Sequence, residues 1–271
     1  MISLNSKPFA LMGIINVTPD SFYDGGRYSC ADSAVRHGLE LIEQGADILD
    51  IGGASSRPGA AVVDPQEEIR RVVPVIKKLA RQSNTPISID TTWAATAKAA
   101  IESGASWIND ISAGRFDSQI PTLAAQCGCT VVLMHSRKNP QTMQDNPQYN
   151  DVVRDVKSEL MESVERFTAA GVQKERMILD PGIGFAKTFN HNITLLQQLE
   201  RLKELGCPLM LATSRKSFIG TITGSPTHQR LAGSLATVAS AFLKGISIFR
   251  VHDVKETADF LRVFAAVEQL P

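Results

Sequence analysis

Residues 177–187 read M-I-L-D-P-G-I-G-F-A-K, in which three apolar residues precede a carboxylate and a glycine-containing turn. The apolar residues are typical of a strand buried on both faces, and the proline and glycine after Asp180 end that strand. A carboxylate at a strand end can accept hydrogen bonds from a ligand that carries N–H donors. For one isolated aspartate, capping a helix or bracing the loop is the more common explanation. Asp180 is therefore informative only if similar residues accompany it.

Polar side chains end several other apolar segments in the same way. With Asp180, the set consists of Asn16, Asp50, Asp90, Asn109, His135, Lys216, Arg250 and His252. Any one of them is more readily explained as structural. If the segments are strands of one parallel barrel, however, all of their carboxyl ends open onto a single mouth, where such folds place their sites. A shared mouth would make the whole set a binding site.

One part of this set suits a flat heterocycle. Asp90, Asn109 and Asp180, together with the ring of Phe185, offer acceptors, an amide and a stacking face. Two carboxylate oxygens can match two N–H groups of a guanidine-like edge. We therefore predict a planar ligand with an amino-pyrimidinone edge, such as a pterin or guanine. Burial would raise the pKa of each aspartate unless the N–H groups of the ligand compensate.

The other part of the set suits an anion. Arg215, Lys216, Arg250 and His252 carry cationic or donor side chains, and Asn16 lies opposite them in the expected fold. A guanidinium and an imidazole one residue apart suit phosphate oxygens, and barrels often hold phosphate after their last two strands. The structural alternative for Arg250 is an ion pair with a neighbouring strand end.

A recurring order of amphipathic helix, glycine and short apolar strand must position these residues. Glycine fits the left-handed position that closes a helix. We expect helices at about residues 31–44, 65–82, 151–170, 229–244 and 255–269, with shorter ones ending at Gly104, Gly128 and Gly206. Eight strands, each followed by a helix and with no linker between them, predict an α/β fold, a (β/α)8 TIM barrel, as a single domain over residues 1–271. A doubly wound open sheet is the alternative.

Composition excludes several other classes of protein. The 271 residues are 43% hydrophobic and carry 28 basic and 28 acidic side chains, which argues against nucleic acid or an anionic membrane as the partner. The four cysteines show no C-x-x-C pair, which favours a reducing, cytoplasmic location. The first residues lack a secretory signal. The apolar segment 231–243 is too short to span a bilayer and better suits a buried or subunit-facing helix.

Two loops are rich in Gly, Pro, Ser and Asp. They are residues 18–26, T-P-D-S-F-Y-D-G-G, and residues 54–59, A-S-S-R-P-G. Such loops could act as mobile lids, which would keep water away from a reactive cation.

The chain resembles the dihydropteroate synthase family in several motifs that occur in the family's order and cover essentially its whole length. These are G-I-I-N-V-T-P-D-S-F-Y-D-G-G (13–26), G-A-D-I-L-D-I-G-G-A-S-S-R-P-G-A (45–60), S-I-D-T (88–91), I-N-D-I (108–111), L-D-P-G-I-G-F-A-K (179–187), S-R-K-S (214–217) and R-V-H-D-V (250–254). The resemblance implies a cytoplasmic, homodimeric transferase of folate biosynthesis. Such an enzyme joins dihydropterin pyrophosphate to para-aminobenzoate, uses Mg²⁺, and is a target of sulfonamides.

The family pattern also implies a role for each matching residue. The pterin would be held by Asp90, Asn109, Asp180 and Lys216, with further substrate contacts from Met134 and Phe185. The pyrophosphate would be held by Arg250, His252 and Asn16, with Asn16 touching its Mg²⁺. The aminobenzoate pocket would be shaped by Ser56, Arg57, Pro58 and Ser217. The residues expected to act in catalysis are Asp90, Lys216, Arg250 and His252.

Two departures from the family pattern lie near the expected mouth. Ala54 stands where a glutamate is usual, and Ser136 and Arg137 stand where methionine and glutamine are often found. They bear on aminobenzoate affinity and on the response to sulfonamides rather than on the transfer reaction.

Three other functions remain compatible with parts of the sequence. A pterin-binding methyltransferase would share the barrel but would have no pyrophosphate to hold, in contrast to the R-V-H motif. A Schiff-base lyase would use Lys216 as its nucleophile. A pterin-binding protein without activity would fit the changes in the loops.

Overall fold

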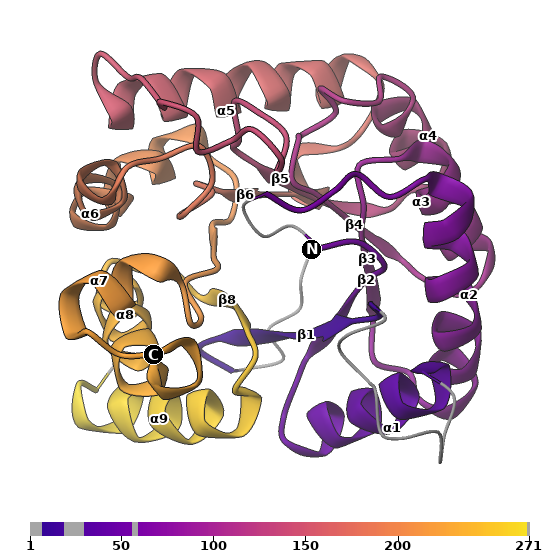
Figure 1. Ribbon diagram of the computed structural model, residues 1–271, viewed down its shortest axis with the longest axis horizontal. Coiled ribbons are helices and arrows are strands. Elements are labelled where there is room, and N and C mark those ends of the chain that lie inside the picture. The colour runs from indigo at the N-terminus through magenta and orange to yellow at the C-terminus, as the bar shows by residue number, and fades with distance from the viewer. Residues whose placement is uncertain (1–6, 19–29, 56–58, 270–271) are drawn as a thin grey trace.

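The computed structural model describes residues 7–18, 30–55 and 59–269. In this part of the chain, eight parallel strands form one sheet in the order β6-β5-β4-β3-β2-β1-β8-β7. An isolated parallel bridge between Leu179 and Leu209 brings β6 beside the residues that lead into β7. The strands thus form a nearly closed barrel, and the helices lie in a ring outside it (Figure 1). The predicted (β/α)8 fold is confirmed, and the open-sheet alternative is wrong because the two edges meet.

The strands are short and carry the polar residues near their carboxyl ends. They are β1 (Ala10–Asn16), β2 (Ile48–Gly52), β3 (Ile87–Asp90), β4 (Trp107–Asp110), β5 (Thr130–Met134), β6 (Met177–Asp180), β7 (Met210–Leu211) and β8 (Ile248–Val251). Strand β2 continues two residues beyond Asp50, which we expected at its end. Asp50 consequently lies inside the barrel.

The helices largely follow the expected ranges. They are α1 (Cys30–Glu43), α2 (Pro65–Gln82), α3 (Ala94–Glu102), α4 (Ile120–Cys127), α5 (Val152–Ala169), α6 (Phe189–Gln197), α7 (Ser217–Thr223), α8 (Leu231–Leu243) and α9 (Val254–Val267). Two details differ from the prediction. The helix expected to end at Gly206 gives way to a 3-10 segment, Leu199–Leu205, and the short helix α7 was not predicted.

The predicted helix–glycine–strand order has a clear local cause. Gly128 ends α4 in the left-handed conformation, with φ 62°, and its N–H donates back to the last turn of the helix. Strand β5 begins two residues later. At the other end, Asp64 and Asp151 accept hydrogen bonds from backbone N–H groups in the first turns of α2 and α5. These caps fix where α2 and α5 start and where α4 stops.

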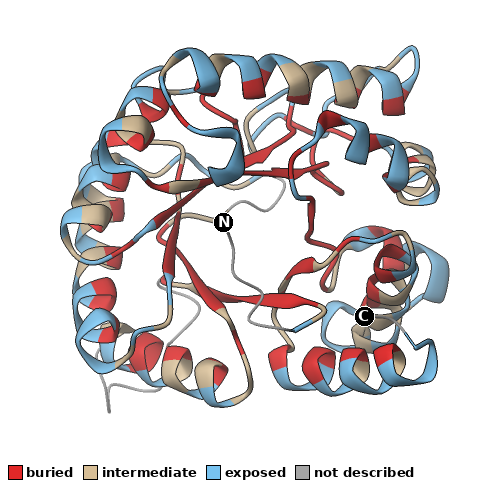
Figure 2. Ribbon diagram, turned by 180° about the vertical axis from the view of Figure 1, so that it is seen from behind, coloured by how far each residue is buried: buried red, intermediate tan, exposed pale blue. Residues whose placement is uncertain are grey.

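The apolar core has two main parts, one on each face of the sheet, and a third, small cluster that consists of Ile111, Met134, Met143, Phe185 and Ala186. The larger part packs the helices onto the outside of the barrel. The smaller part fills the barrel interior with Ala10, Met12, Ile48, Trp107, Val132, Ile178, Met210 and Ile248. Figure 2 shows the strands as buried and the outward helix surfaces as exposed. Because side chains alternate across a strand, the residues two positions beyond this inner apolar layer also point inward.

No helix within the described residues combines the length and the hydropathy needed to cross a membrane.

Candidate functional site

Four strands place a polar side chain directly above the apolar layer of the barrel interior. In each of them an inward apolar residue is followed two positions later by an inward polar one. The pairs are Ile48 and Asp50, Trp107 and Asn109, Ile178 and Asp180, and Ile248 and Arg250. The strand pattern therefore brings together side chains that lie up to 200 residues apart in the sequence.

Arg250 connects the acidic side chains of this layer. Its Nε donates to Asp50 Oδ2 at 2.6 Å, and its Nη2 donates to Asp90 Oδ2 at 2.7 Å. Asn109 Nδ2 donates to the same Asp50 oxygen at 2.9 Å. The ion pair considered as the structural alternative for Arg250 is thus present. It also brings the expected heterocycle side and the expected anion side into direct contact.

Burial shifts the pKa values of the ionisable side chains at the mouth. Burial, together with the nearby Asp50, raises the pKa of Asp90 to about 7, against the opposing effect of Arg250. The pKa of Asp180 is also raised by burial, although the Gly182 N–H and Lys216 lower it. Burial lowers the pKa of Lys216 to about 8, while Asp180 opposes that shift. Asp90 can therefore change its protonation state close to neutral pH.

Asp180, Lys216 and Phe185 meet at the turn that follows β6. The Gly182 N–H donates to Asp180 Oδ1 at 2.7 Å. Lys216 Nζ donates to the Ile183 carbonyl and lies 4.2 Å from the centre of the Phe185 ring. A carboxylate, an ammonium and an aromatic face thus lie together, so Lys216 lies beside the heterocycle side and not with the anion side, where the residue pattern had grouped it.

The residues after β7 and β8 are also close to one another. His252 Nδ1 lies 3.0 Å from Ser214 Oγ, and the His252 backbone N–H donates to the same oxygen at 3.2 Å. Arg215, which we grouped with the anion side, instead forms an ion pair with Asp253. Ser217 begins helix α7 directly after Lys216.

Asn16 is the residue expected to contact a metal ion. It ends β1, where it pairs with Gly52 of β2, and it is partly exposed. Across the residues that the structure describes, no group of three His, Cys, Asp or Glu side chains could hold a metal ion. Asn16 offers one amide oxygen, a type of ligand that Mg²⁺ accepts together with phosphate oxygens.

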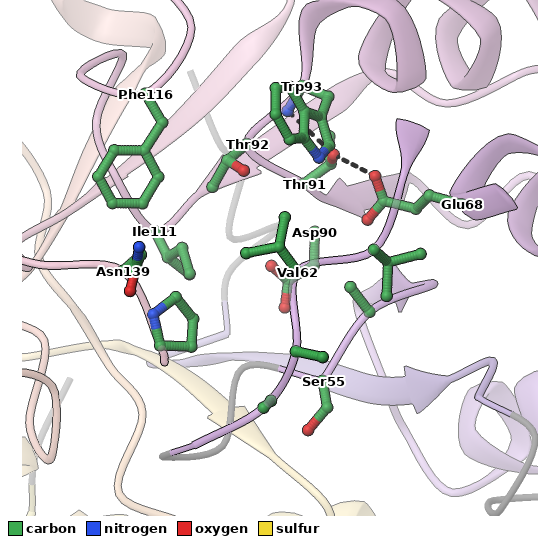
Figure 3. Close-up of a pocket in the computed structure, with 15 residues that line it drawn as sticks. Ser55, Val62, Glu68, Asp90, Thr91, Thr92, Trp93, Ile111, Phe116 and Asn139 are labelled. Atoms are coloured by element: carbon green, nitrogen blue, oxygen red, sulfur yellow. Dashed lines mark hydrogen bonds between the residues drawn. The ribbon is translucent and has the colours of Figure 1, made fainter. Parts of the chain in front are cut away.

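A cavity of about 240 Å³ lies beside Asp90. Ala54 lines it, together with Val62, Trp93 and Phe116 from neighbouring segments. At its edge Glu68 accepts a hydrogen bond from Thr91 Oγ1 at 2.7 Å (Figure 3). Ser56, Arg57 and Pro58, and residues 19–26 of the first loop, lie outside the described residues.

His135 does not lie on the rim of the mouth, contrary to our expectation. Met134 occupies the inward position at the end of β5, so the next side chain points outward. His135 is 1% exposed, and its Nε2 lies 3.0 Å from Glu159 Oε2 on α5. Arg137 also turns toward α5, where it pairs with Glu159 and Asp155.

Sequence reasoning missed two groups that contribute to this region. We placed Asp50 at the rim but did not recognise it as the residue that pairs with Arg250. Lys187 was quoted only within a motif, yet it is buried at 3% exposure and contacts His135. A lysine at the end of a glycine-rich turn was the available signal for this contact.

Comparisons with known proteins agree on one family. The family described as pterin binding enzyme matches residues 12–252. The chain is 45% identical to the dihydropteroate synthase of Bacillus subtilis, over 97% of this chain and 93% of that protein. A Xanthomonas albilineans dihydropteroate synthase structure with 4-aminobenzoic acid aligns with a TM-score of 0.91 at 45% identity, over 97% and 94% of the two chains. A Yersinia pestis dihydropteroate synthase structure with a sulfonamide drug aligns with a TM-score of 0.90 at 41% identity, over 96% and 94%.

Replacing Asp50 by alanine tests the buried ion pairs of the site. The change removes the acceptor of both Arg250 Nε and Asn109 Nδ2. We expect the free energy of unfolding, measured by urea denaturation, to fall by about 3–5 kcal/mol, because a buried charge loses its partner. Glu204→Ala breaks the exposed pair with Lys157 and should leave that free energy unchanged. Equal effects of the two substitutions would contradict the importance of the buried pair.

Proposed function

The chain belongs to the dihydropteroate synthase family of pterin-binding enzymes, and on that basis we propose that it condenses 6-hydroxymethyl-7,8-dihydropterin diphosphate with para-aminobenzoate. The products are 7,8-dihydropteroate and pyrophosphate, so the enzyme is a transferase of folate biosynthesis. The observation that carries the proposal is the mouth itself, where a buried carboxylate side adjoins a cationic side. This is the division that a flat ring with a diphosphate tail requires.

We assign the pterin to the side formed by Asp90, Asn109, Asp180 and Lys216. Buried carboxylates in this layer can accept hydrogen bonds from the amino-pyrimidinone edge. The Phe185 ring offers a stacking face beside Lys216, and Met134 lies on the inner face of β5. A neutral ring with N–H donors would complement this side better than a second anion would.

We assign the pyrophosphate to Arg250, His252 and Asn16. The two ion pairs of Arg250 use two of the five N–H donors of its guanidinium. Asn16 could contribute one amide oxygen to Mg²⁺, with phosphate oxygens completing the coordination. Bound Mg²⁺ would neutralise charge on the diphosphate.

The residues suggest a dissociative displacement. The bond between the pterin methylene and the diphosphate oxygen breaks, and its electron pair leaves with pyrophosphate. Arg250 and His252 stabilise the developing negative charge, while the buried carboxylates, chiefly Asp90, favour the cationic methylene. The amine of para-aminobenzoate then bonds to that carbon and loses a proton. Because this amine is the nucleophile, the scheme needs no nucleophile from the protein. Lys216 serves to orient the pterin.

The aminobenzoate pocket is assigned to Ser217 and to the second loop, with Ser56, Arg57 and Pro58. By analogy with the Yersinia pestis complex, we propose that sulfonamides compete at this pocket. Ala54 lines a cavity at the base of the loop where the family usually has a carboxylate. Arg137 pairs with α5, so it does not add its charge to the mouth.

We treat residues 1–271 as one pterin-binding barrel domain. The cytoplasmic location stays a prediction that rests on the cysteine pattern. The 45% identity to dihydropteroate synthases favours a synthase over the methyltransferase, the Schiff-base lyase and the inactive binding protein.

An assay of pyrophosphate release tests the proposed function directly. The purified chain is incubated with the pterin diphosphate and Mg²⁺, with para-aminobenzoate first added and then withheld. We expect pyrophosphate release and dihydropteroate formation in equal amounts, and both should depend on para-aminobenzoate. Binding of the pterin without release would instead support an inactive binding protein.

The pKa of Asp90 predicts a pH dependence of pterin binding. Its pKa is about 7, and only its ionised form accepts two N–H hydrogen bonds. Calorimetry with hydroxymethyl-dihydropterin, which carries no phosphate, should therefore show affinity rising about tenfold from pH 6 to pH 8. Asp90→Asn should bind weakly and without this pH dependence. A flat profile in the unsubstituted chain would remove Asp90 from the pterin site.

We also propose a homodimer that uses α8, as the apolar character of Leu231–Leu243 suggests. A groove along α6, α7 and α8 is lined by Leu196, Phe218 and Ile222, and the Ile222 side chain is 61% exposed. Sedimentation should give twice the chain mass of 29.4 kDa, and Ile222→Asp should shift it toward the monomer. A monomer at all concentrations would contradict the dimer.

A further inference from the structure

Lys187 is a buried lysine to which the proposed reaction assigns no role. Its Nζ donates to the Gly182 carbonyl at 3.0 Å and to the Phe185 carbonyl at 2.9 Å. It also lies 2.9 Å from His135 Nδ1. Lys187 therefore links the end of the turn 182–187 to Gly182, the first residue of that turn. Of the acceptors just named, His135 Nδ1 is the one on a side chain.

The surroundings of Lys187 define the protonation states of Lys187, His135 and Glu159. Burial lowers the pKa of Lys187, but four acceptors surround its Nζ: His135 Nδ1 and the carbonyls of Gly182, Phe185 and His135. The ammonium form, which has three N–H groups, meets more of them than the neutral amine can. Burial, helped by Lys187, lowers the pKa of His135 to about 3, so its ring is neutral. Burial raises the pKa of Glu159, but hydrogen bonds from His135 and Arg137 lower it to about 2. His135 Nδ1 therefore accepts from Lys187, and its Nε2–H donates to the Glu159 carboxylate.

The turn 182–187 depends on side-chain donors for its backbone carbonyls. Five consecutive carbonyls accept such hydrogen bonds: Gly182 and Phe185 from Lys187, Ile183 from Lys216, Gly184 from Gln144, and Ala186 from Tyr149. Gly182 has a φ of 66°, and a Cβ atom there would lie 1.9 Å from the His135 carbonyl oxygen. The turn therefore has little conformational freedom while these donors are in place.

The same turn holds the heterocycle side of the mouth. The Gly182 N–H donates to Asp180, and the Gly182 carbonyl accepts from Lys187. The Phe185 carbonyl is held by Lys187, while its ring lies 4.2 Å from Lys216 Nζ. A shift of this turn would move the Asp180 carboxylate and the Phe185 ring together.

We propose that Lys187, oriented by His135 and Glu159, is a positioning residue that sets the geometry of the pterin side of the site without touching the substrate. This inference rests on the proposed function, since it assigns the pterin to Asp180 and Phe185. The anion side, with Arg250 on β8, lies outside the turn and should not depend on Lys187.

Lys187→Met tests the proposal with two ligands that report on the two sides separately. Titration calorimetry uses hydroxymethyl-dihydropterin for one side and inorganic pyrophosphate with Mg²⁺ for the other. We expect the pterin dissociation constant to rise at least tenfold and the pyrophosphate dissociation constant to stay within twofold. The matched control, Lys157→Met, removes a partly exposed lysine on α5 and should change neither. Unchanged pterin affinity, or an equal loss for both ligands, would overturn the proposal.

A second pair of variants applies even if Lys187→Met fails to fold. In His135→Asn the amide oxygen can replace Nδ1 as the acceptor of Lys187, whereas in His135→Gln the amide nitrogen can replace the Nε2–H donor to Glu159. We expect the Gln variant to lose more pterin affinity than the Asn variant, by about fivefold or more. Equal affinities would overturn the role of Lys187.

Activity of the unsubstituted chain separates this proposal from the proposed function. If the chain binds pterin and releases no pyrophosphate, the synthase assignment fails, while the binding measurements still decide the role of Lys187. If the chain is active and Lys187→Met binds pterin normally, the positioning role alone fails.

Discussion

Arg250 lies between the buried carboxylate of Asp50 and the largely buried carboxylate of Asp90, and the interior of the barrel depends on that arrangement. Removing charged groups from water costs several kcal/mol for each ion, which only well-formed hydrogen bonds offset. Arg250 of β8 contacts Asp50 of β2 and Asp90 of β3, with β1 between β8 and β2. The strands must therefore keep their register for the charges to meet. The inner apolar layer fixes that register, because a slip by one residue would exchange apolar and polar positions.

The sequence was sufficient to predict the architecture because its local signals are strong and consistent. Helix-ending glycines such as Gly128, capping aspartates such as Asp64, and short apolar strands all indicate the same repeat. The 3-10 segment Leu199–Leu205 and the short helix α7 were missed. The 3-10 segment has its buried leucines at every third position, a period that differs from that of an α-helix, and α7 is too short to show a period. The extra length of β2 likewise comes from pairing with its neighbours, which local sequence does not report.

The site was predictable where a side chain follows directly from strand alternation. Asp90, Asn109, Asp180 and Arg250 lie on the inner face, as expected from their places at strand ends. His135 was misplaced because it follows the inward Met134 and so points to the helices. For Arg250 the sequence indicated an ion pair with a strand end, and for Lys187 the glycine-rich turn was a signal of a local role. The identity of their partners was not predictable, because Asp50 and His135 come from distant segments. The residues of the second loop remain predictions, since they lie outside the described part of the chain.

The closure of the barrel between β6 and β7 has a consequence for the stability of the barrel as well as for ligand binding. In the described residues, β6 and the segment before β7 share one isolated bridge, Leu179 to Leu209, whereas β1 and β2 share a continuous register. Asp180 stands on one side of this seam, and Lys216 lies beyond β7 on the other side. A substrate held by both residues would span the seam and tie its two edges together. Since such a ligand binds only the closed barrel, its binding free energy would add to the stability of the least connected part of the sheet.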